Sequence, residues 1–290
     1  MNDFVIITDS CCDLPAKLAE ELELTVMPLS VLLKGKEYRN YLDEREITFS
    51  DFYAEIRAGH QATTSAVNAD AFMNVFESVL IQGKDILSIS FSSALSSTYH
   101  FSTVAASELA EKYPERKIIT VDSLCASLGQ GLLLKLAVDY KRQGKSLEEV
   151  HAFVEEKKHQ LCHWFTVDDL NHLRRGGRIS RATAVLGVML NIKPILHCDA
   201  EGKLTGVSKT RGRKKALEGL VDRMQKTVID SKSQTVFISH ADCIEDAELT
   251  AEIIRSRMKV KDILINSVGP VIGAHCGPGT VALFFLGTER

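Results

Sequence analysis

The first half of the chain alternates short runs of apolar and β-branched residues with helical patterns, and this alternation limits the possible folds more than any other feature. Strands are expected at four such runs, at residues 4–8, 25–33, 86–91 and 118–121. Helices should follow most of them, beginning with residues 14–22, where Asp13 would cap the helix and Pro15 would lie in its first turn. Further on, Ser146 and Glu149 predict a capping box. Strand, turn, helix and strand at this spacing form the βαβ unit, which builds a mainly parallel sheet flanked by helices.

The pattern changes after about residue 160, where the β-rich runs become longer. They cover residues 187–198, 203–209, 235–239 and 281–286. A turn at Gly202 predicts an antiparallel hairpin from the first two runs, and helices are expected at residues 213–228 and 245–258. A chain of 290 residues is longer than one hydrophobic core usually serves. We therefore predict two α/β domains, residues 1–160 and 161–290, with a mixed or antiparallel sheet in the second.

The composition argues against several classes of protein. The formal net charge of -3 gives no general attraction to nucleic acid, and no apolar run approaches the roughly 20 residues that span a bilayer. The first ten residues include Asp3 and Thr8, which do not fit a secretory signal. Seven cysteines include no C-x-x-C pair, which argues against a disulfide framework and a structural zinc site. We expect a cytoplasmic protein with reduced thiols, no metal and no transmembrane segment.

Common catalytic and nucleotide-binding motifs are missing from the sequence. Gly129 and Gly131 are followed by a leucine run, so the third glycine of G-x-G-x-x-G is absent. The G-K-S that begins at Gly144 lacks the first glycine of a P-loop. Neither G-x-S-x-G nor H-E-x-x-H occurs. We therefore expect no bound nucleotide cofactor.

Two hydroxyl-rich segments precede predicted helices. The first, at residues 62–66, includes Thr64 and Ser65, and by itself it is most simply interpreted as a turn with a helix N-cap. The second covers residues 92–98. There Ser93 could cap the helix and leave Ser96 in the first turn, beside free backbone N–H groups and the positive end of the helix dipole. Such an arrangement suits an anion.

Two glycine-rich segments carry basic side chains. In the first, paired glycines hold arginines, including Arg178, close together after a helical stretch, although simple surface exposure explains it equally well. The second is a loop at residues 269–280 with one imidazole, His275, before the last apolar strand. A lone histidine is more often packed or exposed than functional.

Taken together and in this order, these segments resemble the DegV family of bacterial lipid-binding proteins over essentially the whole chain. The similar motifs are I-T-D-S from Ile7, S-S-A-L-S-S-T-Y from Ser92, G-G-R-I-S from Gly176 and P-V-I-G-A-H-C-G-P-G from Pro270. Two departures concern T-S-A-V at residues 64–67, where the family usually has T-S-Q-P, and Ser97, where glycine is common.

The resemblance implies two α/β domains with a fatty acid bound between and within them. It also implies a non-catalytic carrier, the acyl-carrying subunit of a bacterial fatty acid kinase, with a palmitate- or oleate-like ligand and no cofactor. Transient contact with a membrane surface is compatible with that role. The roles carried over are carboxylate binding for Thr64, Ser96 and His275, a supporting network for Ser65, Ser93 and Arg178, and partner docking for Arg211 and Arg213.

A fatty acid site needs a small polar end for the carboxylate and a dry tunnel for the tail. The apolar segment 185–190 is a candidate wall, although it is also typical of an ordinary core. The basic cluster at residues 209–215 is a candidate docking face for an acidic partner surface, and it is equally typical of a solvated helix start. Phosphoryl transfer needs a magnesium nucleotide site, which this sequence lacks, so ATP should belong to the partner.

Two other functions remain open from the residues alone. A lipid esterase or thioesterase would use Ser96 as nucleophile and His275 as base, although no acidic third member is evident. A nucleic-acid regulator would have only the cluster at residues 209–215 to support it, and we expect no nucleic-acid partner.

Overall fold

The protein, seen here in a computed structural model that describes residues 3–179 and 191–290, contains two large sheets and one small one. The candidate tunnel wall at residues 185–190 and the start of the strand predicted at residue 187 lie outside the described residues. The first large sheet is entirely parallel, as predicted. Its strand order is β2 (Thr25–Met27), β1 (Phe4–Asp9), β6 (Asp85–Ser90) and β7 (Ile118–Asp122).

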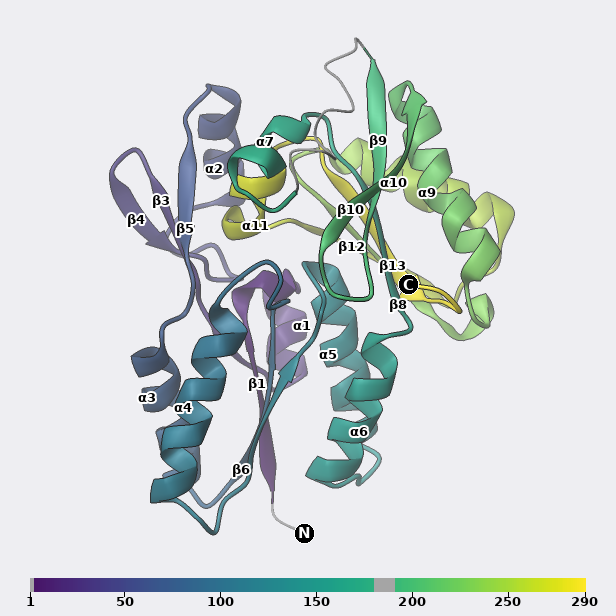
Figure 1. Cartoon of the computed structure of the whole chain (residues 1–290). Coiled ribbons are helices and arrows are strands. Elements are labelled where there is room, and N and C mark those ends of the chain that lie inside the picture. The colour runs from purple at the N-terminus through teal and green to yellow at the C-terminus, as the bar shows by residue number, and fades with distance from the viewer. Residues whose placement is uncertain (1–2, 180–190) are drawn as a thin grey trace.

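Helices cover both faces of this parallel sheet, as the βαβ pattern predicted (Figure 1). One side carries α3 (Ala69–Ile81) and α4 (Thr98–Lys112), and the other carries α5 (Leu128–Lys141) and α6 (Leu147–Lys158). The capping box predicted at the start of α6 is present, since Ser146 and Glu149 bond to each other's backbone N–H groups.

The small sheet corrects the prediction of one long strand at residues 25–33. That run divides into β2 and β3 (Ser30–Leu33), and β3 pairs antiparallel with β4 (Lys36–Arg39) and β5 (Ala62–Ser65). Proline has no backbone N–H to donate to a ladder, which explains the break at Pro28. The small sheet lies beside α2 (Phe49–Arg57).

The second large sheet is mixed, as predicted. The strand order is β10 (Leu204–Arg211), β9 (Ile192–Cys198), β8 (Leu161–Thr166), β13 (Val281–Leu286), β11 (Thr235–His240) and β12 (Asp262–Ser267). Among these described strands only β11 and β12 are parallel neighbours, and Gly202 forms the predicted hairpin turn between β9 and β10 with a φ of 76°.

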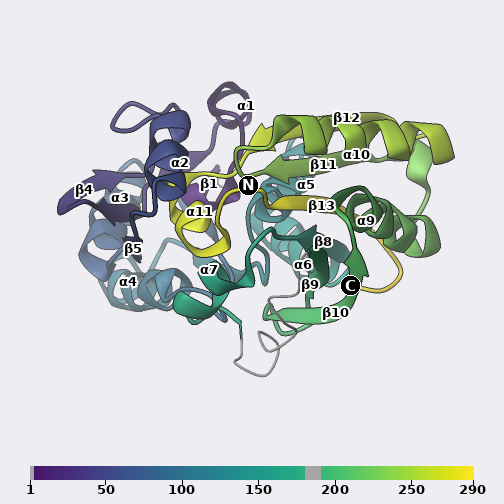
Figure 2. The same ribbon diagram turned by 90° about the horizontal axis from the view of Figure 1, so that it is seen from above.

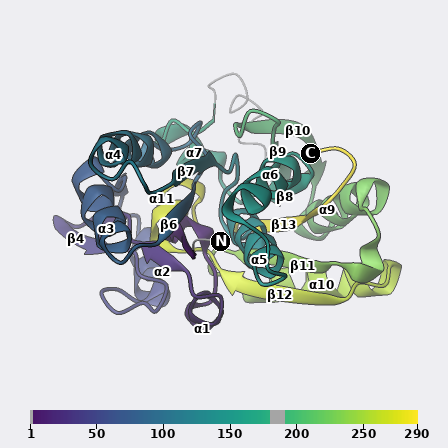
Figure 3. The same cartoon turned by 90° about the horizontal axis from the view of Figure 1, so that it is seen from below.

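Helices α9 (Arg213–Thr227) and α10 (Ile244–Arg257) pack against the mixed sheet, while α5 lies between the two large sheets (Figure 3). The absence of side chains at two α5 glycines permits this close packing. A Cβ at Gly129 would come within 2.1 Å of His163 on β8, and one at Gly131 would meet the backbone oxygen of Cys12 at 2.8 Å.

Asp13 does not cap the first helix, contrary to the prediction. The helix α1 (Ala16–Glu21) begins after Pro15 with no side-chain cap, and Asp13 instead follows the short helix η1 (Ser10–Cys12). Its buried carboxylate accepts hydrogen bonds from Ser127 Oγ at 2.6 Å and from Gly269 N at 3.0 Å. Asp13 therefore links the N-terminal part of the chain to Gly269, which lies just before Pro270 near the C-terminal end of the chain.

The glycine-rich segment at residues 269–280 is not simply a loop, because its first part forms α11 (Pro270–Cys276). Proline at the first helical position is compatible with a helix because its missing N–H has no intrahelical partner there. Figure 2 shows α11 between α2 and α7 (Leu170–Arg175), with which it is in contact. None of the helices in the described ranges has the length and hydropathy of a transmembrane span.

Candidate functional site

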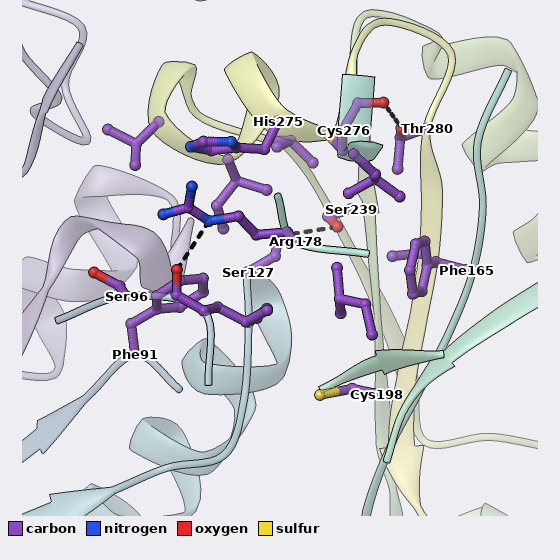
Figure 4. Close-up of a pocket in the computed structure, with 18 of the residues that line it drawn as sticks. Phe91, Ser96, Ser127, Phe165, Arg178, Cys198, Ser239, His275, Cys276 and Thr280 are labelled. Atoms are coloured by element: carbon purple, nitrogen blue, oxygen red, sulfur yellow. Dashed lines mark hydrogen bonds between the residues drawn. The ribbon is translucent and has the colours of Figure 1, made fainter. Parts of the chain in front are cut away.

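A cavity of about 250 Å³ lies where α11, the segments that follow β6 and β7, and the mixed sheet meet (Figure 4). Strands of a parallel sheet end at one edge, where connecting segments leave room for a ligand. Most of the lining is apolar and buried. It includes Phe91, Leu95, Phe165, Leu173, Val271 and Phe284. Such a lining suits an apolar ligand.

The polar end of the cavity contains a hydrogen-bonded pair, Thr64 and His275. Thr64 Oγ1 from β5 lies 2.8 Å from His275 Nε2 on α11. Burial, together with the nearby Arg178 guanidinium, lowers the pKa of His275 to about 4, so the imidazole is neutral at pH 7. Neutral imidazole carries one N–H.

This pair keeps one unused donor in either histidine tautomer. If Thr64 O–H donates to Nε2, the ring hydrogen is on Nδ1, which has no hydrogen-bond partner among the described residues. If Nε2–H donates to Thr64, the threonine hydroxyl hydrogen is left unused. The Nδ1 atom is buried beside Gly176, so the hydrogen available to a carboxylate in the cavity is the Thr64 hydroxyl hydrogen of the second tautomer. A carboxylate that receives it does not face a buried formal charge on His275.

Ser96 and Arg178 line the same cavity. Ser96 Oγ lies 2.9 Å from Thr98 Oγ1 and accepts a hydrogen bond from Thr98 N at 3.3 Å. Arg178 donates to the backbone oxygens of Leu95 at 3.0 Å and Gly176 at 2.6 Å, which fixes its half-buried guanidinium. Burial lowers the pKa of Arg178, yet arginine stays protonated in proteins.

The structure therefore brings Thr64, Ser96, His275 and Arg178 to one cavity, although their contact with a carboxylate stays a prediction. Figure 4 shows Ser96, Arg178 and His275 on one side of the view, and Phe165 and Cys198 on the other.

Ser65 and Ser93 do not line the cavity, and their supporting role stays a prediction. Residues 62–65 form a strand rather than an N-cap turn, so Ser65 points away from Thr64, and Asn68 caps α3 instead. Ser93 is exposed, and its backbone N–H donates to Asp122 Oδ1 at 3.1 Å. It does not cap α4, so Ser96 precedes that helix instead of lying in its first turn.

A second polar group, which no sequence motif indicated, lies in the cavity wall. Ser127 Oγ donates to Asp13 Oδ2 at 2.6 Å and lies 3.0 Å from Ser239 Oγ, and both serines line the cavity. Burial raises the pKa of Asp13 to about 7. Ser127 has a φ of 53°, a conformation that non-glycine residues rarely adopt. No local pattern predicted this group, because its members are more than 100 residues apart.

The predicted docking residues differ in their surroundings. Arg211 ends β10 and is exposed. Arg213 begins α9 and is ion-paired with Asp246 at 2.9 Å and Asp168 at 3.5 Å. Arg213 thus joins parts of the same chain, and Arg211 is the more available for a partner.

The arrangement does not resemble a serine hydrolase. Within the described residues no hydrogen bond joins Ser96 to His275, whose Nε2 is engaged by Thr64. No carboxylate orients the Nδ1 atom of His275, which has no partner in the described part of the chain. A catalytic triad requires both contacts.

Comparison with known proteins gives one family. A model described as "Uncharacterised protein, DegV family" matches residues 3–288. The chain is 47% identical to a DegV domain-containing protein of Clostridium perfringens, over 100% of this chain and 99% of that protein. The structure of a DegV family protein of Thermus thermophilus, described for its fatty acid binding, matches with a TM-score of 0.86 at 33% identity, over 98% of this chain and 99% of that chain. DegV of Bacillus subtilis, described as a fatty acid binding protein, matches with a TM-score of 0.84 at 28% identity, also over 98% and 99%. Since the family model and the Clostridium relative each cover nearly the whole chain, this protein belongs to the DegV family.

Proposed function

We propose that this chain binds one long-chain fatty acid, with the tail in the apolar cavity and the carboxylate at Thr64, Ser96 and His275. The observation that carries this proposal is the neutral Thr64–His275 pair at the polar end of a buried apolar cavity, in which the Thr64 hydroxyl can donate to a ligand when His275 Nε2–H donates to Thr64. Fatty acid binding by the related proteins of Thermus thermophilus and Bacillus subtilis supports it.

The tail supplies most of the affinity in this proposal. Each buried methylene contributes roughly 0.8 kcal/mol, so a chain of about fifteen gains on the order of 10 kcal/mol before ordering costs are subtracted. The polar end mainly fixes the orientation of the acid, because hydroxyl and imidazole donors replace water at the carboxylate. Arg178 holds this end in place through its two backbone contacts.

We further propose that the protein is a cytoplasmic carrier that presents the carboxylate to a partner kinase for acyl-phosphate formation. The lack of a recognisable nucleotide motif supports a partner that supplies ATP. The exposed Arg211 is the proposed docking residue for an acidic surface of that partner. We also propose that the chain divides into two domains at residue 160. The position of all strands of the mixed sheet after that residue supports this division.

Mass spectrometry of lipid extracted from the purified protein tests the binding step. We expect one long-chain acid per chain, and a strongly reduced amount in Thr64→Ala. Thr63→Ala is the matched control, because Thr63 is the neighbouring exposed residue on β5 and lines the adjoining pocket that is open to solvent, not the apolar cavity. A lipid-free protein that also fails to bind added palmitate or oleate would disprove the proposal.

A further inference from the structure

A second pocket of about 250 Å³ shares three residues with the apolar cavity: Thr64, Arg178 and His275. These residues therefore form a partition, with the apolar cavity on one side and the second pocket on the other. Exposed residues at the rim, including Gln61 and Arg175, open the second pocket to solvent. We call it the outer pocket.

The outer pocket is basic. Its lining includes Arg175, Arg178, His60 and His172, and none of the described residues that line it is acidic. His60 is paired with Glu55 at 3.4 Å, so the two arginines supply most of its positive charge. The chain as a whole carries a formal charge of -3, so this concentration of cations is local.

Hydrogen bonding orients the donors of this pocket. Arg175 donates to His172 Nδ1 at 3.2 Å, and arginine cannot accept, so the His172 hydrogen is on Nε2. Burial, and then the charge of Arg175, lowers the pKa of His172, which favours the neutral ring. The arginine fork and the Nε2–H group suit an anion with several oxygens.

Glycines keep the space beside these groups open. A Cβ at Gly176 would lie 2.3 Å from His275 Nδ1, and one at Gly277 would lie 2.4 Å from the His172 ring. Gly277 also has a φ of 75°, which favours glycine. The two glycine-rich motifs therefore permit the histidine positions at the partition and in the outer pocket.

We propose that the outer pocket binds the phosphoryl group of an acyl phosphate whose acyl chain stays in the apolar cavity. This inference rests on the proposed function and extends it to the product. A carboxylate oxygen at the partition attacks the terminal phosphorus of a nucleoside triphosphate held by the partner. The new bond joins that oxygen to phosphorus, and the bond from phosphorus to the nucleoside diphosphate breaks. No net proton is gained or lost, because the product gains one negative charge as the nucleotide loses one.

The fatty acid and the acyl phosphate need different hydrogen-bond donors at the head site, by which we mean the partition residues Thr64, Arg178 and His275. The fatty acid has one negative charge, which the neutral Thr64–His275 pair can satisfy from the partition. The acyl phosphate has two charges and three further phosphoryl oxygens, which match Arg175 and the His172 N–H group. Arg175 should therefore favour the product over the substrate.

Calorimetry with two probes tests this division. The probes are hexadecanoate and a long-chain β-ketophosphonate, in which a CH₂ group replaces the anhydride oxygen of the acyl phosphate. We expect the phosphonate to bind the unaltered protein roughly tenfold more tightly, as a charge-assisted hydrogen bond provides. Arg175→Ala should remove that preference.

Arg174→Ala is the matched control. Arg174 is the adjacent exposed arginine on α7, and it does not line the outer pocket. The Arg174→Ala variant should keep the tenfold preference for the phosphonate over hexadecanoate. Equal affinity of the unaltered protein for the two probes, or the same loss in both arginine variants, would overturn the inference.

A titration with inorganic phosphate separates this inference from the proposed function. Phosphate should shift the ring NMR signals of His172 in the unaltered protein and in Arg174→Ala, but much less in Arg175→Ala. If phosphate shifts them while hexadecanoate does not bind, the proposed function fails and the anion site stands. If hexadecanoate binds and phosphate has no effect in any variant, the anion site is wrong and the proposed function stands.

Discussion

Replacing Thr64 by valine tests the polar end of the cavity with little change in shape. Valine is β-branched like threonine and suits β5, but it removes the hydroxyl that lies 2.8 Å from His275 Nε2. A hydrogen bond to a charged group contributes about 1.5–3 kcal/mol. The Kd for hexadecanoate should therefore rise roughly 10- to 100-fold, since 1.4 kcal/mol corresponds to a factor of ten.

The assay is isothermal calorimetry with hexadecanoate and with hexadecanol, which has the same tail but no carboxylate. Thr64→Val should weaken hexadecanoate much more than hexadecanol, because the tail contacts are retained. Thr63→Val is the control for the substitution itself, since Thr63 is exposed and outside the cavity lining. An equal loss for both ligands would show that Thr64 acts on the shape of the cavity and not on the head group, which would refute this reasoning.

Three further predictions concern other parts of the structure. Burial raises the pKa of Asp13 from 3.8 to about 7, so Asp13 binds a proton more tightly in the folded protein, and its contribution to the free energy of unfolding falls as pH rises from about 4 to 7. In urea unfolding, Asp13→Asn should therefore gain stability relative to the unaltered protein across that range. A stability difference that does not change with pH would contradict this prediction. Gly176→Ala places a Cβ 2.3 Å from His275 Nδ1, so it should cost about 1–3 kcal/mol in urea unfolding and reduce the lipid extracted with the protein, whereas normal retention would show that the ring can move. Arg211→Ala should keep its lipid, but the partner kinase should phosphorylate that bound fatty acid more slowly in a radiolabel assay. Loss of the lipid would mean that this arginine is not a docking residue.

The two large sheets could be predicted from the sequence because hydrophobic periodicity is local. The parallel sheet, the mixed sheet, the Gly202 hairpin and the capping box at Ser146 were all confirmed. Two errors in the predicted secondary structure occur at prolines. Pro28 divides one apolar run between two sheets, and Pro270 begins a helix inside a segment whose glycines suggested a loop.

The site was predicted less completely, because its contacts join distant residues. Motif order selected Thr64 and His275, but only the fold brings these residues, 211 positions apart, within hydrogen-bond distance. The opposite orientations of Thr64 and Ser65 could have been predicted by treating residues 62–65 as a strand, since adjacent side chains then point to opposite faces. For Ser127 and Ser239 no such signal exists, because their link to Asp13 depends entirely on packing between α5 and the mixed sheet.

The polar end of the cavity is formed by residues from both halves of the chain, so a ligand bound there should stabilise the contact between them. Thr64 belongs to the small sheet, whereas His275 belongs to α11, which packs on α2. Tyr53 on α2 donates a hydrogen bond to the backbone oxygen of Val268 at 2.8 Å, and a Cβ at Gly273 would come within 2.5 Å of the same hydroxyl. The head site therefore exists only while α11 stays packed on α2, so a fatty acid bound there must stabilise this packing. Ligand at one hundred times its Kd adds about 2.7 kcal/mol to the folded state, and amide hydrogen exchange should show that protection in α11 as well as around the cavity.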